Sequence, residues 1–282
     1  MPPIEKGKNI LLRWLGVAGI ELHKGKETLL IDPFLSRPPL RFIFSGRAKP
    51  DHDLIITHIP QAEYVLVSHS HYDHLMDVPV IALHTSAQIY GSVNTCQILR
   101  IHRIPENQIH LIVDGDKFSA GDFYVSVLPA KHPYAPGYTS GHLKPNLAPP
   151  LQLRDYRMDS CYSFLIKAGG LQILVWSSIS TNSAQPADIL FLRAAADQDW
   201  YAELLTKVKP KLVIPTHWDN IFQPLSKSTQ PFFTPPVLSL PPIRRINLDD
   251  FKRKIQSIFP HCQVLIPQIF KWYDLAKESG IF

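Results

Sequence analysis

Short apolar runs separated by turn residues are the dominant pattern near the start of the chain. Residues 10–14, 20–23 and 28–31 are such runs, with glycines between them. Apolar runs bounded by glycine are typical of strands joined by tight turns, so these runs predict three consecutive strands. Further strands are predicted at residues 65–68, 82–84, 88–90, 109–113, 123–129, 160–168, 171–176, 188–192, 211–215 and 264–270, and a turn at residues 116–121.

Helical periodicity follows the strands in each half of the chain. Residues 247–259 place apolar side chains three or four positions apart, which is the spacing of one helix face. Pro79 favours a helix that begins near Asp77, because proline is tolerated in a first turn. Residues 96–102 and 200–207 also predict helices. This order, strand-rich and then helix-bearing in both halves, favours an α+β sandwich with helices outside.

Three segments rich in proline or glycine interrupt these elements, near residues 36–53, 133–159 and 219–243. Long irregular segments in a compact domain are usually functional, so we expect them to form the rim of a site. Their aromatic residues would suit an apolar or acyl part of a substrate, or would simply cover the core: Phe42, Phe44, Tyr134, Tyr138, Phe232 and Phe233.

Composition indicates a soluble globular chain. Hydrophobic residues make up 45% of its 282 residues, and no apolar run approaches the ~20 residues of a membrane span. Cys96, Cys161 and Cys262 are an odd, widely spaced set, which suggests neither a disulfide framework nor a zinc ribbon. With no signal-peptide pattern at the N-terminus, we expect one cytoplasmic domain over residues 1–282.

The charge balance is basic, with a formal net charge of +5. This balance favours an anionic small-molecule substrate. The basic residues are scattered and form no stripe, so a nucleic-acid partner is not expected. The pattern leaves the oligomeric state open.

The strongest candidate for a functional site in the sequence is the segment Ser68-His69-Ser70-His71-Tyr72-Asp73-His74, which begins at the end of the run of apolar and small residues at 65–68. Imidazole and carboxylate are ligands that suit Zn²⁺, and also Fe²⁺ or Mn²⁺. His69 and His71 can converge on one ion if the loop is extended, and Asp73 and His74 can serve a second. The alternative is a polar loop with chance histidines, since the chain has 13.

The His-x-His-x-Asp-His spacing at residues 69–74 resembles the metallo-β-lactamase superfamily. Residues 15–19 (Leu-Gly-Val-Ala-Gly), Asp32-Pro33 and residues 215–219 (Pro-Thr-His-Trp-Asp) extend the resemblance to roughly residues 10–270. These motif sequences are most similar to those of the branch that contains ascorbate-6-phosphate lactonases and N-acyl-phosphatidylethanolamine phospholipases D. The resemblance implies a four-layer αββα sandwich.

The resemblance also implies a ligand set. His132, just past the strand at residues 123–129, completes a first set with His69 and His71, as a catalytic ion needs about three protein ligands. The second set is Asp73, His74 and His217. Asp32 is expected to orient a metal-bound histidine through a hydrogen bond. The alternative for Asp32 is a turn residue before Pro33.

Two positions depart from the pattern. The superfamily commonly has a metal-bridging aspartate where this chain has Ser178, or Ser177 if the register slips. A serine hydroxyl is a poor ligand beside a carboxylate, so Ser178 is at most a weak metal or substrate contact. Val17 stands where the branch often has a histidine that contacts substrate. We therefore expect one or two ions, with a weaker second site.

These features predict a hydrolase in which a metal-activated hydroxide attacks a phosphodiester or a lactone or other ester. Asp73 would orient the nucleophile and shuttle its proton. Two alternatives remain. One is a catalytically weakened binding or regulatory protein on the same fold, suggested by Ser178. The other is a nuclease of the superfamily, which would need a basic groove that the sequence does not display.

Overall fold

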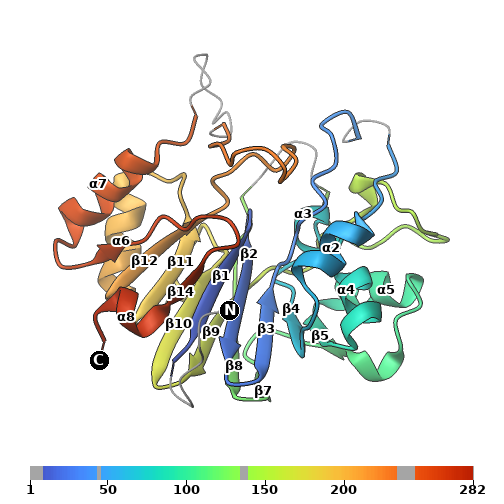
Figure 1. Ribbon diagram of the computed structural model, residues 1–282, viewed down its shortest axis with the longest axis horizontal. Coiled ribbons are helices and arrows are strands. Elements are labelled where there is room, and N and C mark those ends of the chain that lie inside the picture. Colours follow the sequence, from blue (N-terminus) through green and yellow to red (C-terminus); the bar gives the residue numbers. More distant parts are fainter. Residues whose placement is uncertain (1–8, 43–45, 134–138, 234–244, 282) are drawn as a thin grey trace.

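The computed structural model describes residues 9–42, 46–133, 139–233 and 245–281. Within these ranges, the strands form two seven-stranded sheets that pack face to face (Figure 1). Phe44, Tyr134 and Tyr138, three of the aromatic residues assigned to the rim, lie outside the described residues, as do parts of all three predicted rim loops.

The first sheet contains strands from both ends of the chain. Its order is β14 (Trp272–Asp274), β1 (Leu11–Gly16), β2 (Gly19–Lys24), β3 (Glu27–Ile31), β4 (Tyr64–Leu66), β5 (Gln88–Gly91) and β6 (Ile109–Leu111). Neighbours from β14 to β3 are antiparallel, and those from β3 to β6 are parallel. The three predicted N-terminal strands are therefore confirmed.

The second sheet repeats this division. Its order is β13 (Gln263–Val264), β12 (Leu212–Thr216), β11 (Ile189–Arg193), β10 (Leu171–Trp176), β9 (Tyr162–Ala168), β8 (Phe123–Pro129) and β7 (Lys117–Ala120). Neighbours from β7 to β10 are antiparallel, and those from β10 to β13 are parallel.

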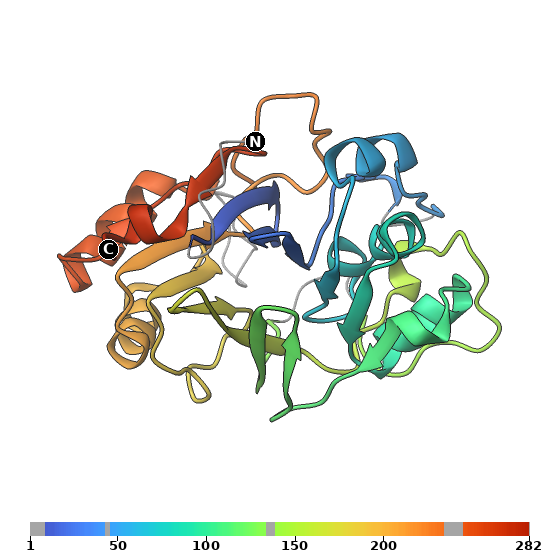
Figure 2. The ribbon, with the colours of Figure 1, turned by 60° about the horizontal axis from the view of Figure 1, so that its bottom comes forward.

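Helices occupy the crossovers, because parallel neighbours need long connections. The first half has α2 (His52–His58), α3 (Tyr72–Leu75), α4 (Val78–Thr85), α5 (Val93–Ile101) and the 3₁₀ turn η1 (Glu106–Gln108). The second has η2 (Leu153–Asp155), α6 (Gln198–Val208), α7 (Leu248–Ile258) and α8 (Leu275–Ser279). Figure 2 shows α6 and α7 on one side of the sheets and α2, α4 and α5 on the other.

Three apolar layers hold these elements together. Leu22 and Phe164 are fully buried between the sheets. Val65 is buried beneath the helices of the first half, and Leu190 and Leu204 lie in the layer beneath α6 and α7. Removing such side chains from water is the main stabilising term. The architecture is the four-layer αββα sandwich that the resemblance implied.

The strand directions bring the candidate ligands to one edge. In the first sheet, β3 and β4 are parallel and end next to Asp32 and Ser68. In the second sheet, β8, β10 and β12 run in the same direction, and their ends lead to His132, Ser177 and His217. The carboxyl ends of parallel strands are a common location for binding residues.

Several sequence predictions need correction. Residues 82–84 belong to helix α4 and not to a strand, because a short apolar run does not distinguish a buried helix from a strand. Residues 117–120 form strand β7, where only a turn was expected. The closing strand predicted at residues 264–270 is limited to Gln263–Val264 in β13, and the chain then crosses to the other sheet to form β14.

The rim segments contain more regular structure than predicted. Helix α2 begins inside the first of them, where the Asp51 side chain accepts a hydrogen bond from the amide of Leu54. This N-cap satisfies one of the amides that a helix start leaves without an intrahelical partner. Among the described residues, no helix has the length and apolar character needed to cross a membrane.

Candidate metal centre

The His-x-His-x-Asp-His segment divides between a loop and a helix. His69 and His71 lie in the loop that follows β4, and Asp73 and His74 lie on α3. His71 is the N-cap residue with extended backbone (φ −67°, ψ 155°), and its side chain makes no capping hydrogen bond. Because the backbone changes from extended to helical at this point, the His69 and His71 side chains belong to one group of potential ligands, and the Asp73 and His74 side chains belong to an adjacent group.

His69, His71 and His132 form the first group, which we call trio one. Their ring centroids are 4.7 to 4.8 Å apart in every pair. One potential ligand atom from each residue lies within 4.8 Å of the other two. The loop after β8 therefore brings His132 to the histidines that follow β4.

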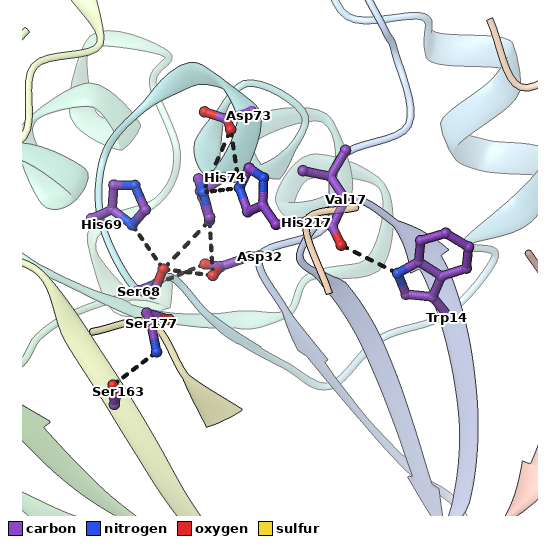
Figure 3. A network of polar contacts seen from close by, with 10 residues as sticks. All are labelled: Trp14, Val17, Asp32, Ser68, His69, Asp73, His74, Ser163, Ser177 and His217. Carbon is purple, nitrogen blue, oxygen red and sulfur yellow. Dashed lines mark hydrogen bonds and ion pairs between the residues drawn. The ribbon is translucent and has the colours of Figure 1, made fainter. Parts of the chain in front are cut away.

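Asp73, His74 and His217 form the second group, trio two. Nε2 of His217 is 3.3 Å from Nε2 of His74 and 3.4 Å from Oδ2 of Asp73. Nε2 of His74 is 3.6 Å from the same carboxylate oxygen. The trios adjoin, since the rings of His69 and His74 are 3.9 Å apart (Figure 3). That either trio binds an ion stays a prediction.

Asp32 and Ser68 fix the protonation pattern of one histidine in each trio. Oδ2 of Asp32 lies 2.9 Å from Nδ1 of His74 and accepts the Ser68 hydroxyl at 2.5 Å. Since that hydroxyl proton points to Asp32, the Ser68 oxygen is the acceptor for Nδ1 of His69 at 2.9 Å. In its neutral form, each of these two rings then carries its proton on Nδ1 and presents an Nε2 lone pair to the site.

The donor set fits a divalent metal ion. Nε2 of His69 is buried and has no hydrogen-bond partner among the described residues, which is costly unless something else occupies its lone pair. Five imidazoles and one carboxylate are ligands typical of zinc and iron. Each trio supplies three protein ligands, which leaves a coordination position for solvent or substrate.

Burial keeps trio one neutral. It lowers the pKa of His71 to about 3, and together with the neighbouring His74 it lowers the pKa of His132 to about 4. The pKa of His69 is lowered well below its ordinary value by burial and by His74. Neutral imidazole is the form that binds metals, so these side chains need lose no proton to bind one.

In trio two, charged neighbours outweigh the effect of burial on the pKa values and favour the charged forms. Burial alone would lower the pKa of His74, but Asp32 and Asp73 outweigh it and the pKa is raised. Burial alone would raise the pKa of Asp73, but His74 and His217 lower it below its ordinary value. In the absence of an ion, trio two is therefore a charge-paired cluster.

Residues 139–159, part of the second predicted rim segment, contact trio one through a backbone carbonyl that sequence reasoning missed. The carbonyl oxygen of Thr139 lies 3.2 Å from Nε2 of His71. The Ser70 hydroxyl donates to the carbonyl of Arg157, and the Asn94 amide group donates to the carbonyls of Arg157 and Gly141. Contacts made by backbone carbonyl groups cannot be predicted from the residue types, because every residue has a carbonyl group.

Ser178 has a bonding role in the loops that surround the site. It is buried, and its hydroxyl oxygen accepts hydrogen bonds from the amides of Lys131 (2.9 Å) and Ser180 (3.0 Å). The bond from Lys131 ties the loop after β10 to the loop that carries His132. Ser177 donates its amide to the hydroxyl of Ser163. A metal or substrate contact of Ser178 stays a prediction.

Known proteins resemble this chain in sequence and in fold. A metal-dependent hydrolase (UPF0173) of Carboxydothermus hydrogenoformans is 27% identical over 220 residues, 74% of this chain and 84% of the relative. The solved structure of Igni18, a metallo hydrolase from Ignicoccus hospitalis, superposes with a TM-score of 0.60 at 15% identity and covers 95% of this chain and 98% of Igni18.

A third protein with this fold is a hydroxylase and not a hydrolase. CmlA of Streptomyces venezuelae, a diiron β-hydroxylase, superposes with a TM-score of 0.58 at 15% identity, over 97% of this chain and 55% of CmlA. At such identities, the superpositions show the fold alone. Residues 27–218 match the family described as the beta-lactamase superfamily domain. This match covers more than half of the sequence, and the chain therefore belongs to the metallo-β-lactamase superfamily.

Proposed function

We propose that trio one and trio two each hold a divalent ion, with Zn²⁺ as the first candidate, and that the pair hydrolyses an anionic phosphodiester or lactone. The chain is a metal-dependent hydrolase, as its curated relatives are named. The observation that carries the proposal is the adjacency of two three-ligand groups at one sheet edge. Iron and manganese are the alternative metals, and CmlA has the same fold with two irons.

Ions bound there would lower the pKa of a coordinated water and polarise the bond under attack. The chain's own residues supply orientation. Asp73 is ionised because its pKa lies below the ordinary value, so its carboxylate accepts a hydrogen bond from the attacking water. His217 is the more open member of trio two, with 35% of its side chain exposed, so substrate would approach from that side.

Arg193 supports an anionic substrate. It ends β11 and pairs in register with Thr216, next to His217. Burial lowers the pKa of its guanidinium, and Nε is buried without a hydrogen-bond partner among the described residues. The Trp200 ring, 5.7 Å from Cζ, compensates part of this cost, and Tyr201 and Asp197 also favour the charged form. An anionic group of the substrate would compensate the rest, because buried charges are normally paired.

Steady-state kinetics on matched substrates test this assignment. We expect Arg193→Gln to raise KM about tenfold or more for an anionic phosphodiester, and to change KM little for a neutral ester of the same leaving group. The control is Arg100→Gln, whose exposed guanidinium pairs with Glu106. Equal effects on both substrates would contradict the role of Arg193, whereas loss of all turnover together with the metal would concern the trios.

One observation favours a second candidate, a binding or regulatory protein. The position expected for a bridging aspartate holds Ser178, whose oxygen already accepts two backbone amides. Fewer than one ion per chain, with no turnover of phosphodiesters or lactones, would favour that function over hydrolysis.

A further inference from the structure

The backbone at His217 is held in an unusual conformation. His217 has φ +55°, and its amide donates to the carbonyl of Val17 at 2.9 Å. Val17 itself has φ +48°, which is costly for a β-branched residue. Such conformations persist only where the surroundings impose them. The turn between β1 and β2 and the end of β12 therefore restrain each other.

Asp219 links the same two segments a second time. Its side chain is 1% exposed, and its Oδ1 accepts the amide of Val17 at 2.9 Å. The two segments are thus joined in both directions, because Val17 accepts from His217 and donates to Asp219. The Trp14 ring stacks on Trp218, with centroids 4.9 Å apart, and donates its Nε1–H to the carbonyl of Val17 (Figure 3 shows this bond).

Arg37 completes the arrangement from the first rim segment. Its Nη2 donates to Oδ2 of Asp219 at 2.7 Å, and its Nη1 donates to the carbonyl of Asn220 at 2.8 Å. The guanidinium packs so closely on the turn that a Cβ atom on Gly16 would lie 2.0 Å from Nη2. Arg37 can reach this position because Asp77 accepts the amides of Leu35 and Ser36 and so fixes the segment before it.

We propose that Arg37 and Asp219 form a positioning pair that sets the orientation of His217 toward Asp73 and His74. The pair touches neither reacting atoms nor a candidate ligand atom, and acts through the backbone of residues 217–220. This inference rests on the proposed function, because it requires His217 to bind an ion. A buried ion pair that served stability alone would have no selective effect on that ion.

Metal titration separates the two roles. The reference is the ion whose affinity falls in His217→Ala, measured with Zn²⁺ on metal-free protein. We expect Arg37→Met and Asp219→Asn to lower the affinity for that same ion by about 10–100-fold, which is the usual effect of disturbing a partner that orients a ligand. The ion held by trio one keeps its affinity within about twofold, since its ligands contact neither residue.

The control variant is Arg13→Met. Arg13 pairs with Glu21 at 2.5 Å, also with little exposure, but this pair joins strands β1 and β2 and not the segment at residues 217–220. We expect it to lower the melting temperature and leave both affinities unchanged. Arg37→Lys, which keeps the charge but not the two-pronged geometry, provides a folded intermediate case if Arg37→Met unfolds.

The possible failures are distinguishable. If Arg37→Met, Asp219→Asn or Arg37→Lys loses stability but binds the reference ion as the wild type does, the pair is structural and the inference is wrong. If His217→Ala lowers the affinity for neither ion, the proposed function itself fails at trio two. A selective loss in the Arg37 and Asp219 variants, absent in Arg13→Met, supports the inference.

Discussion

Oδ2 of Asp32 lies 2.9 Å from Nδ1 of His74 and also accepts the hydroxyl of Ser68, which contacts His69. One buried carboxylate therefore orients a histidine of each trio, one directly and the other through a hydroxyl. Asp32 adopts φ +46° just after β3, a conformation that aspartate tolerates better than most residues. The sheet edge thus supplies both the ligands and the group that orients them.

Asp32→Asn should lower the affinity of both trios for their ions. In the wild type, Oδ1 accepts the amide of Ser68 while Oδ2 accepts the Ser68 hydroxyl and faces Nδ1 of His74. The amide of asparagine keeps the size of the side chain but has only one acceptor oxygen, so it cannot accept at both positions. We expect about a 10–100-fold loss of Zn²⁺ affinity, measured by titration of metal-free protein. Asp51→Asn is the control, because Asp51 caps α2 and should affect stability only. Unchanged affinity in Asp32→Asn would contradict the orienting role.

Ser68→Ala and Ser68→Thr should differ. Alanine removes the acceptor for Nδ1 of His69, so the ring is free to turn and trio one should lose affinity for its ion. Threonine keeps the hydroxyl and should restore binding to within a few-fold of the wild type. The check is Zn²⁺ affinity of both variants beside their melting temperatures. Equal loss in the two variants would indicate a packing effect instead.

The metal-free chain should lose stability as the pH falls from 6.5 toward 4. His71 and His132 have folded pKa values of about 3 and about 4 against an ordinary value of 6.5, so in this window the unfolded chain binds more protons. Each group contributes a slope of up to about 1.4 kcal/mol per pH unit. His74, whose pKa is raised, is protonated in both states within this window, so its contribution changes only above pH 6.5. Urea unfolding across the window measures the slope.

The variant His71→Ala checks the assignment of that slope. It removes one lowered pKa and should make the dependence shallower between pH 4 and 6.5. A slope equal to that of the wild type would mean that other groups govern acid stability.

Gly16→Ala should disturb the site from a distance. The new Cβ would lie 2.0 Å from Nη2 of Arg37, and the backbone has φ +93°, which alanine rarely adopts. Gly25→Ala is the control, since its φ is also positive (+62°) but a Cβ there meets nothing within 4 Å. We expect both variants to be destabilised and only Gly16→Ala to lose affinity for the ion that His217 binds. Identical metal affinities in the two variants would contradict this expectation.

The sequence predicted the parts of the site whose residues are close together or lie at recognisable strand ends. His69, His71, Asp73 and His74 fall within six positions, and His132 and His217 follow apolar runs at motif positions of the superfamily. The pairing of Arg37 with Asp219 spans 182 residues and depends on the turn at Val17, so no local pattern indicates it.

The incorrect element assignments have local causes. Residues 82–84 continue an apolar run from Val78, and a run without a clear period does not distinguish a helix from a strand. Helix α2 carries a usable local signal, an N-cap aspartate at position 51 three residues before the apolar residues that begin at Leu54. The short closing strand could not be separated from the crossover to β14, because partner choice is a long-range property.

The number and location of bound ions test the central claim most directly. Metal analysis of the purified wild type, His71→Ala and His217→Ala, combined with anomalous scattering from crystals, would report both. We predict ions at trio one and trio two in the wild type, loss of the first in His71→Ala, and loss or weakening of the second in His217→Ala. Hydrolysis should fall with the metal. Full hydrolysis by a metal-free His71→Ala variant, or ions bound only elsewhere, would contradict the account.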